Sequence, residues 1–328
     1  MNQKPLQATR ERISPNPYVF IVGCPRSGTT LLQRIVDAHP QMAIINETRW
    51  IAKTFHQREG LTPEGLVTSD LVRKLVEYKR FSQLEIAWEE LEQLIGCGEP
   101  MGNADFVSKL FDHYAARHGK RFAGDKTPGY ARWLPTLHAL WPRVKFVHLI
   151  RDGRDVCLSA LAWVSDDMKD RYPTWHDNPV FTAAMWRKRN VRLAREAGRK
   201  LTPDLYYEMR YEALVARPVE ECQALCDYLG VAYDPLMVRF HEARRTDGGR
   251  ERRRDRLPIT PGLRNWKSQM SAEDVERFEA AAGDLLDELG CERALPQPSE
   301  GIRQQASSIR NQFAQRIGAR GRWLPEQW

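Results

Sequence analysis

Long apolar runs are absent from this chain of 328 residues, and no segment approaches the 18 uninterrupted apolar residues that would suggest a membrane-spanning helix. The N-terminal stretch MNQKPLQATRERISPNP also lacks the apolar core of a secretory signal peptide. From these two absences we expect a cytoplasmic protein without a membrane span.

Paired cysteines of the kind that bind zinc are absent as well. Of the six cysteines, Cys222 and Cys226 lie four residues apart on an expected helix, with no matching second pair. This pattern favours free buried thiols and no metal. Hydrophobic residues at 42% and charged residues at 28% are ordinary for a folded domain. The net charge of +7 favours anionic partners of any class, including nucleic acid, an anionic cofactor and an acidic acceptor.

A third absence concerns a single lysine. The stretch IVGCPRSGTT, residues 21–30, follows the phosphate-loop pattern G-x-x-x-x-G-K-[ST] except that Thr29 replaces the lysine. An apolar run precedes the stretch and helical spacing follows it, so the chain has the strand–loop–helix context that anion binding requires. A plain strand–helix turn is the alternative, but the full pattern favours phosphate. The residues expected to bind it are Arg26, Ser27, Gly28, Thr29 and Thr30.

An acidic metal partner is also missing where a nucleoside triphosphatase would place one. The most apolar strand, VKFVHLI at 144–150, ends at the cation Arg151. Phosphoryl transfer needs the loop lysine and Mg²⁺ to neutralise the heavily charged γ-phosphoryl group. A sulfuryl group carries less charge and relaxes that need. A kinase or nucleoside triphosphatase with an atypical phosphate loop is the alternative. The arginine-rich run at 244–256 has no interleaved aromatic residues, so we expect no nucleic-acid partner.

Strands alternate with helices along the chain, which predicts a mostly parallel sheet covered on both faces. We expect strands near 18–22, 42–46, 121–126, 144–150 and 205–210. Helices are expected at about 62–118, 133–140, 182–198, 219–230 and 271–289. The expected organisation is a lead-in at 1–17, one domain at 18–295 and a basic C-terminal tail at 296–328.

Four segments together carry a family resemblance: CPRSGTTLLQRIVDAHP, the ETR after the second strand, GDKTP, and IRDGRDVCLSAL. In this order they resemble the PAPS-dependent sulfotransferases, and most closely their bacterial, tyrosylprotein-sulfotransferase-like branch. The resemblance implies a P-loop NTPase-like three-layer α/β fold with a central mostly parallel sheet and helical insertions. It also implies 3′-phosphoadenosine 5′-phosphosulfate (PAPS) as co-substrate, without a metal.

The resemblance assigns roles around the nucleotide. Residues 26–30 would hold the 5′-phosphosulfate, and Arg151 with Ser159 would hold the 3′-phosphate. Tyr211 matches a Y-E-x-L-V element and would pack near the adenine, with a core aromatic as the alternative. Lys267 lies where the family has a loop over the nucleotide, and Lys267 or a nearby arginine could touch the 3′-phosphate; a solvated basic loop is the alternative.

Three catalytic residues are expected: Glu47, Lys126 and Arg26. Glu47 follows the second strand, where it could take a proton from an acceptor hydroxyl as that oxygen attacks sulfur in line. Lys126 could stabilise the charge that builds on the departing phosphate. The alternatives are an ion pair of Glu47 with Arg49 or Arg26, and a solvated turn position for Lys126. His39 and His148 are expected to be structural.

The acceptor is the part that the sequence leaves open. A hydroxyl is expected, or an amine, on a peptide tyrosine, a glycan, a lipid or a small molecule. The helices at 62–118 and the aromatic segment 163–180 are expected to wall its pocket. The oligomeric state is open too, with a homodimer as one option.

Overall fold

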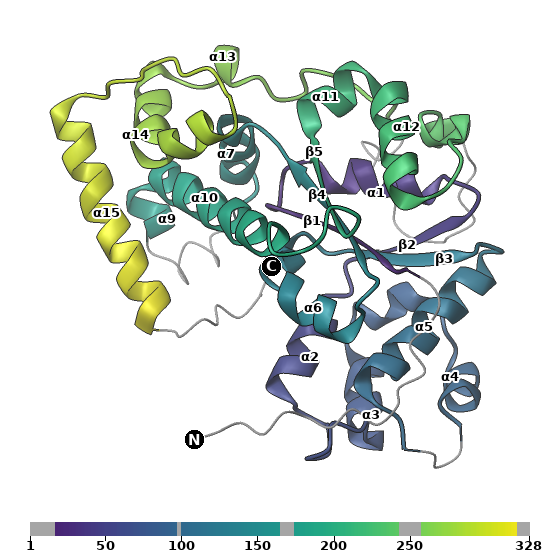
Figure 1. Cartoon of the computed structure of the whole chain (residues 1–328). Helices are drawn as coiled ribbons and strands as arrows, with labels where there is room; N and C mark the ends of the chain where they lie inside the picture. Colours follow the sequence, from purple (N-terminus) through teal and green to yellow (C-terminus); the bar gives the residue numbers. More distant parts are fainter. Residues whose placement is uncertain (1–16, 97–99, 165–173, 243–256, 320–328) are drawn as a thin grey trace.

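The protein is described by a computed structural model covering residues 17–96, 100–164, 174–242 and 257–319 (Figure 1). Its centre is a five-stranded sheet with the order β2-β3-β1-β4-β5, whose strands pair in parallel. The prediction of a mostly parallel sheet is confirmed. The strands are β1 (Val19–Gly23), β2 (Met42–Asn46), β3 (Phe122–Lys126), β4 (Lys145–Ile150) and β5 (Tyr206–Arg210).

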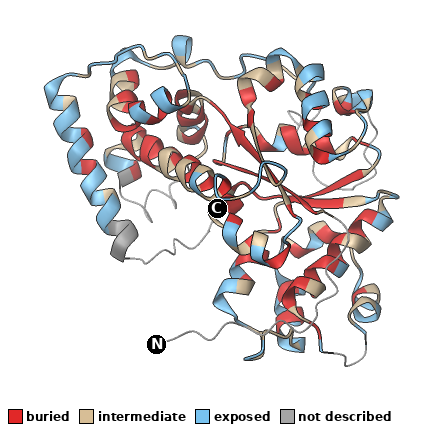
Figure 2. Ribbon diagram, viewed as in Figure 1, coloured by how far each residue is buried: buried red, intermediate tan, exposed pale blue. Residues whose placement is uncertain are grey.

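Helices cover both faces of this sheet, and the strands in Figure 2 are therefore largely buried. The side chains of β1 alternate between the two sides. Phe20 and Val22 join one apolar cluster, whereas Val19 and Ile21 join another. Strands buried on both faces are continuously apolar, which explains the run VFIVG.

The two clusters are formed with different helices. One face carries α1 (Thr29–Asp37), α11 (Tyr211–Ala216) and α12 (Pro218–Leu229). The other carries the segment expected to be helical at 62–118 and its neighbours. These are α2 (Ile51–Gln57), α3 (Ser69–Glu77), the short helix η1 (Phe81–Leu84), α4 (Trp88–Ile95), α5 (Asn103–Arg117), η2 (Pro128–Arg132) and α6 (Leu134–Leu140). The three-layer α/β fold is thus confirmed.

A group of helices extends the molecule beside the sheet (Figure 1). It contains α7 (Gly153–Leu161), α9 (Thr174–Asp177), α10 (Pro179–Gly198), α13 (Trp266–Gln269), α14 (Ala272–Glu288) and α15 (Glu300–Ala319). Within the expected tail, α15 buries Ala306 and Ile309 in an apolar cluster shared with α10 and α14. The domain boundary at 295 stays a prediction.

Parallel pairing brings the carboxyl ends of the strands to one edge. Asn46 lies opposite Lys126, and Gly23 lies opposite Leu149. The residues that follow β1, β2, β3 and β4 therefore meet at that edge, where ligands of open α/β sheets bind. Among the described helices, none is both long and apolar enough to cross a bilayer.

Candidate functional site

The expected phosphate loop connects β1 to α1 at this edge. Helix α1 starts at Thr29, and its N-cap is Gly28 in a left-handed conformation with φ of 93°. A glycine cap offers no side-chain acceptor to the N–H groups of the first turn. A Cβ at this position would lie 2.6 Å from the ring of Tyr211. Gly28 therefore satisfies two requirements at once, positive φ and close approach to that ring.

Arg26 projects from the same loop with a left-handed backbone, φ 75°. Its Nε donates a hydrogen bond of 3.2 Å to Ser159 Oγ on α7, and its guanidinium lies 5.6 Å from the centre of the Trp163 ring. Ser27 is almost fully buried beneath the loop, with its N–H donating to the Cys24 carbonyl at 3.2 Å. Arg26 thus connects the loop to α7.

Glu47 and Lys126 meet directly beside the loop. Lys126 Nζ donates to Glu47 Oε1 at 2.9 Å and to Thr30 Oγ1 at 3.2 Å. Lys126 is 1% exposed, and this burial excludes the alternative of a solvated turn lysine. Thr30 in the first turn of α1, Glu47 just after β2 and Lys126 at the end of β3 therefore form one connected cluster.

Two arginines complete the surroundings of the Glu47 carboxylate. Arg49 donates to Oε2 from Nε at 2.9 Å, and a second ion pair joins its Nη2 to the same oxygen. Arg80, between α3 and η1, lies 3.5 Å from that oxygen. The pairing with Arg49 was one of the sequence alternatives. Arg80 was missed, because it follows an ordinary amphipathic helix and belongs to no motif.

Electrostatics at this cluster stabilise a charged Glu47. Burial opposes its ionisation, but Lys126 and Arg49 outweigh burial and lower the pKa of Glu47 to about 2. The pKa of Lys126 is lowered, chiefly by burial, although Glu47 and Asp125 act in the opposite direction. A half-buried carboxylate with several cationic neighbours is typical of functional sites.

Arg151, directly after β4, supplies another buried positive charge at this edge of the sheet. Its guanidinium sits 4.2 Å from the centre of the Tyr211 ring, and its Nη2 donates to Asp155 Oδ2 at 3.3 Å. The side chain is 6% exposed, and Nε has no hydrogen-bond partner among the described residues. Ser159, expected to act with Arg151, instead accepts from Arg26.

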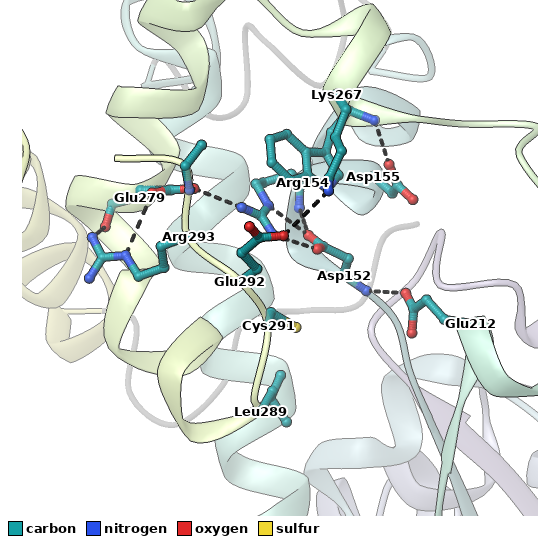
Figure 3. Close-up of polar contacts among 12 residues, drawn as sticks. Asp152, Arg154, Asp155, Glu212, Lys267, Glu279, Leu289, Cys291, Glu292 and Arg293 are labelled. Carbon is teal, nitrogen blue, oxygen red and sulfur yellow. Dashed lines mark hydrogen bonds and ion pairs between the residues drawn. The ribbon is translucent and has the colours of Figure 1, made fainter. Parts of the chain in front are cut away.

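A buried ion network lies next to Arg151 and links α14 to the start of α7 (Figure 3). Arg154 is 1% exposed and pairs with Asp152 and Glu279, each at 2.7 Å. Its guanidinium stacks on the ring of Trp266, 3.6 Å from the ring centre. The backbone N–H of Trp266 donates to Asp155 Oδ1 at 2.9 Å. Asp155 therefore touches both Arg151 and α13.

Lys267 follows Trp266 but points outward. Its side chain is 63% exposed, and its Nζ lies 3.4 Å from Glu292. The arginine run at 244–256 lies entirely outside the described residues. The structure thus places Lys267 beside the Arg151 region without bringing it into the cluster of buried cations.

His39 and His148, the two histidines expected to be structural, make hydrogen bonds within the fold. The Nε2 of His39 bonds the Ala232 carbonyl at 2.8 Å. His148 is fully buried, its Nδ1 lies 2.6 Å from the Tyr206 hydroxyl, and burial lowers its pKa to about 3.

Cysteine thiols and metal ligands are two further kinds of reactive group. Burial raises the pKa of the loop thiol Cys24 to about 12, against the opposing effect of Arg187 and Arg132, so it is inert as a nucleophile near neutral pH. Cys157, Cys222 and Cys226 are likewise free and buried. Across the described ranges, no three His, Cys, Asp or Glu side chains gather closely enough to hold a metal ion.

Comparison with known proteins decides the family. The model described as "Sulfotransferase family" matches residues 17–235, which include the loop, Glu47, Lys126 and Arg151. The chain belongs to the sulfotransferase family. Its reaction class is therefore sulfuryl transfer, and this excludes the kinase or nucleoside triphosphatase alternative.

Relatives of this sulfotransferase come from bacteria and animals. It is 28% identical over 313 residues to "Nodulation protein NoeE" of Sinorhizobium fredii, a match covering 86% of this chain and 68% of the relative. It is 26% identical over 236 residues to "Protein-tyrosine sulfotransferase A" of Caenorhabditis elegans, covering 69% of this chain and 53% of the relative.

Solved structures support the fold of the sulfotransferase. The "Sulfotransferase Domain from the Synechococcus PCC 7002 Olefin Synthase" superposes with a TM-score of 0.58 at 24% identity, covering 85% of this chain and 96% of that one. The "Sulfotransferase Domain from the Curacin Biosynthetic Pathway" has the same TM-score at 19% identity, with 84% and 98% covered.

Proposed function

We propose that this sulfotransferase takes its sulfuryl group from PAPS and passes it to a hydroxyl or amine acceptor by in-line displacement. The acceptor atom attacks sulfur while the bond from sulfur to the bridging phosphate oxygen breaks. 3′-Phosphoadenosine 5′-phosphate (PAP) leaves, and the acceptor proton goes to the Glu47 carboxylate. Arg26, Ser27, Gly28, Thr29 and Thr30 hold the 5′-phosphosulfate at the N-terminus of α1.

The observation that carries this proposal is the double contact of Lys126. Its Nζ donates to Glu47 Oε1 at 2.9 Å and to Thr30 Oγ1 at 3.2 Å. The proposed base and the proposed phosphate loop are thus joined by one cation. A group bound at the loop lies within reach of both the base and the cation, as in-line transfer requires.

The same contact has a consequence for base strength. A carboxylate with a pKa of about 2 accepts a proton poorly. As negative charge develops on the leaving oxygen, Lys126 turns toward that oxygen and its stabilisation of Glu47 weakens. The pKa of Glu47 then rises, so the base strengthens only while the leaving group departs. This exchange favours the transition state over the resting state.

For the nucleotide, the free Arg151 Nε supports a phosphate ligand at the end of β4. The guanidinium is buried and oriented by Tyr211 and Asp155, and its Nε has no described partner. We assign it the 3′-phosphate, with Ser159 as a hydroxyl donor on the α7 side and Lys267 at the outer rim. Tyr211, beside Gly28, lines the adenine side.

The acceptor class is proposed from the relatives. Several carry the name protein-tyrosine sulfotransferase, so a tyrosine-bearing peptide is the first acceptor to test. A panel with labelled PAPS should add a glycan, a lipid-linked hydroxyl and small phenols and amines, because one fold and donor site serve many acceptors.

The nucleotide site is tested by calorimetry with PAP in buffer containing a chelator. We expect binding without added metal. Arg151→Ala should weaken it roughly 10- to 100-fold, the loss of a buried charge-assisted contact of about 1.5–3 kcal/mol. Arg217→Ala, which removes an exposed cation on the α12 side, is the matched control and should bind normally. Equal affinity in wild type and Arg151→Ala would contradict the assignment.

The base is tested by turnover of the best acceptor. Glu47→Gln keeps the shape of the side chain and removes the proton acceptor, so PAP affinity should be largely spared. Turnover should fall about 10²- to 10⁴-fold, the usual contribution of general base catalysis. If Glu47→Gln turns over at the wild-type rate, the role of Glu47 is wrong.

A further inference from the structure

The turn that carries Glu47 has an unusual backbone. Glu47 and Arg49 both have φ of 61°, in the left-handed region that disfavours residues with a Cβ. Two such residues separated by a single position store strain. Backbone of this kind persists only where the surroundings over-determine it. The surroundings of Thr48, which lies between them, should therefore show what holds the turn.

Thr48 is fully buried and is bound at both its backbone and its side chain. Its N–H donates to Asp125 Oδ2 at 3.0 Å. Its Oγ1 shares a hydrogen bond of 3.0 Å with the hydroxyl of Tyr130, which also accepts the N–H of Ile51 at 3.0 Å. The two holding groups come from β3 and η2, about 80 residues further along the chain.

These contacts act on the same residue as the catalytic cluster. Asp125 precedes Lys126, whose carbonyl accepts the Glu47 N–H at 2.9 Å and whose Nζ contacts the Glu47 carboxylate. One dipeptide of β3 thus fixes both the backbone and the side chain of Glu47. Asp125 is fully buried, and keeping a carboxylate there is unfavourable unless its hydrogen bonds compensate.

We propose that Asp125 and Tyr130 are positioning residues, which hold Glu47 and Arg49 in their left-handed conformation through Thr48 and so keep the Glu47 carboxylate on Lys126. This inference rests on the proposed role of Glu47 as base. Both groups bind Thr48 rather than the Glu47 carboxylate, and both therefore act through Thr48. The hydroxyl of Tyr130 and the carboxylate of Asp125 together support a strained turn that the three residues could not maintain alone.

Tyr130→Phe is the decisive variant because it removes only the hydroxyl. The ring, which packs 6.0 Å from Phe20 between centroids, keeps its place in the core. We expect kcat to fall roughly tenfold or more, since a small misplacement of a catalytic group can cost up to about 10²-fold. The affinity for PAP and the KM for PAPS should stay within about twofold, because Arg151 and the loop are untouched.

The matched control is Tyr228→Phe. Tyr228 is a part-buried tyrosine on the opposite face of the sheet, and its hydroxyl donates to the Phe146 carbonyl at 3.1 Å. Its loss should affect stability and leave kcat unchanged. Thr48→Val removes the shared bond from the other side. Combined with Tyr130→Phe, it should add little to the loss in kcat, because both changes break one contact.

Two results would overturn the inference. One is a Tyr130→Phe enzyme with wild-type kcat; the other is a loss of kcat matched by an equal loss of PAP affinity, which indicates general damage to the fold. These outcomes are separable from failure of the proposed base, which Glu47→Gln reports alone. If Glu47→Gln is inactive and Tyr130→Phe is fully active, only the positioning role fails.

Discussion

At the scale of single residues, three positively charged side chains surround the carboxylate of Glu47. Lys126, Arg49 and Arg80 all lie within 3.5 Å of the Glu47 oxygens. One negative charge cannot neutralise three positive ones, so the cluster keeps an excess of positive potential at the carboxyl edge of the sheet. Such potential attracts anions, and its effect is strengthened by burial. Without a bound anion, the site therefore carries positive charge that the Glu47 carboxylate does not neutralise.

Asp125 gives a prediction about pH. Burial raises its pKa to about 6, against the opposing hydrogen bond from the Thr48 N–H. The folded protein thus retains this proton where the unfolded chain has lost it, and the free energy of unfolding falls as pH rises from about 4 to above 6. A shift of about two units corresponds to about 3 kcal/mol. Asp125→Asn should remove this fall in the free energy of unfolding with rising pH.

Urea unfolding of wild type and Asp125→Asn near pH 4 and near pH 7.5 measures the effect. Between pH 4 and pH 7.5, the free energy of unfolding of the variant should rise by about 2–3 kcal/mol relative to that of wild type. The reason is that Asp125 titrates in wild type, whereas an asparagine at this position does not. A constant difference between the two proteins at both pH values would contradict the raised pKa of Asp125.

The sequence predicts only part of the residue cluster. Thr30, Glu47 and Lys126 could be expected at one edge, because Glu47 and Lys126 lie at or just after the carboxyl ends of expected strands and Thr30 belongs to the phosphate-loop pattern that follows another. Arg80 and Tyr130 could not, because they reach Glu47 and Thr48 through tertiary packing and belong to no local pattern. The roles of the site residues remain predictions.

At the scale of elements, helix α14 is fixed to the start of α7 by a buried charge. Glu279, on α14, accepts from Arg154 at 2.7 Å and from the N–H groups of Ala294 and Leu295 at 3.0 and 2.9 Å. This single carboxylate therefore holds α14, the segment after it and the turn that follows Arg151. Figure 3 shows the arrangement.

Glu279→Ala should destabilise the protein by about 3–5 kcal/mol, because it leaves Arg154 buried with one partner fewer. Asp284→Ala is the matched control on the same helix. Asp284 is 53% exposed and pairs with Lys188 and Arg192, so its loss should cost about 1 kcal/mol or less. Equal losses in urea unfolding would show that burial of the network is unimportant.

Elements with strong periodicity were predicted well. The helix expected at 271–289 is α14, Ala272–Glu288, and the Ser271 hydroxyl accepts the Asp274 N–H as its cap, as the SAED start suggests. Helix α15 was not identified, because its amphipathic pattern is weak and its packing depends on α10 and α14. The aromatic segment expected at 163–180 contains α9, and residues 165–173 lie outside the described ranges.

At the scale of the whole molecule, the position of α15 tests where the domain ends. A chain lacking residues 296–328 would expose the cluster that Ala306 and Ile309 now cover. We expect a loss of about 2–4 kcal/mol. This corresponds to a melting temperature roughly 4–12 °C lower. An unchanged melting temperature would support the boundary at 295, and Arg303→Ala, on the exposed side of α15, is the control.

The strand order also has a consequence for synthesis on the ribosome. β1 is central in the sheet, but its neighbours β3 and β4 begin about 100 residues or more further along the chain. β2 pairs with β3, which is made equally late. The apolar segments VFIVG and MAIIN therefore leave the ribosome long before their partners exist. Non-local pairing of this kind is slow and leaves apolar segments open to aggregation. Premature termination before residue 122 would release a fragment with no partner strand for either segment, a substrate for chaperones rather than a folding unit.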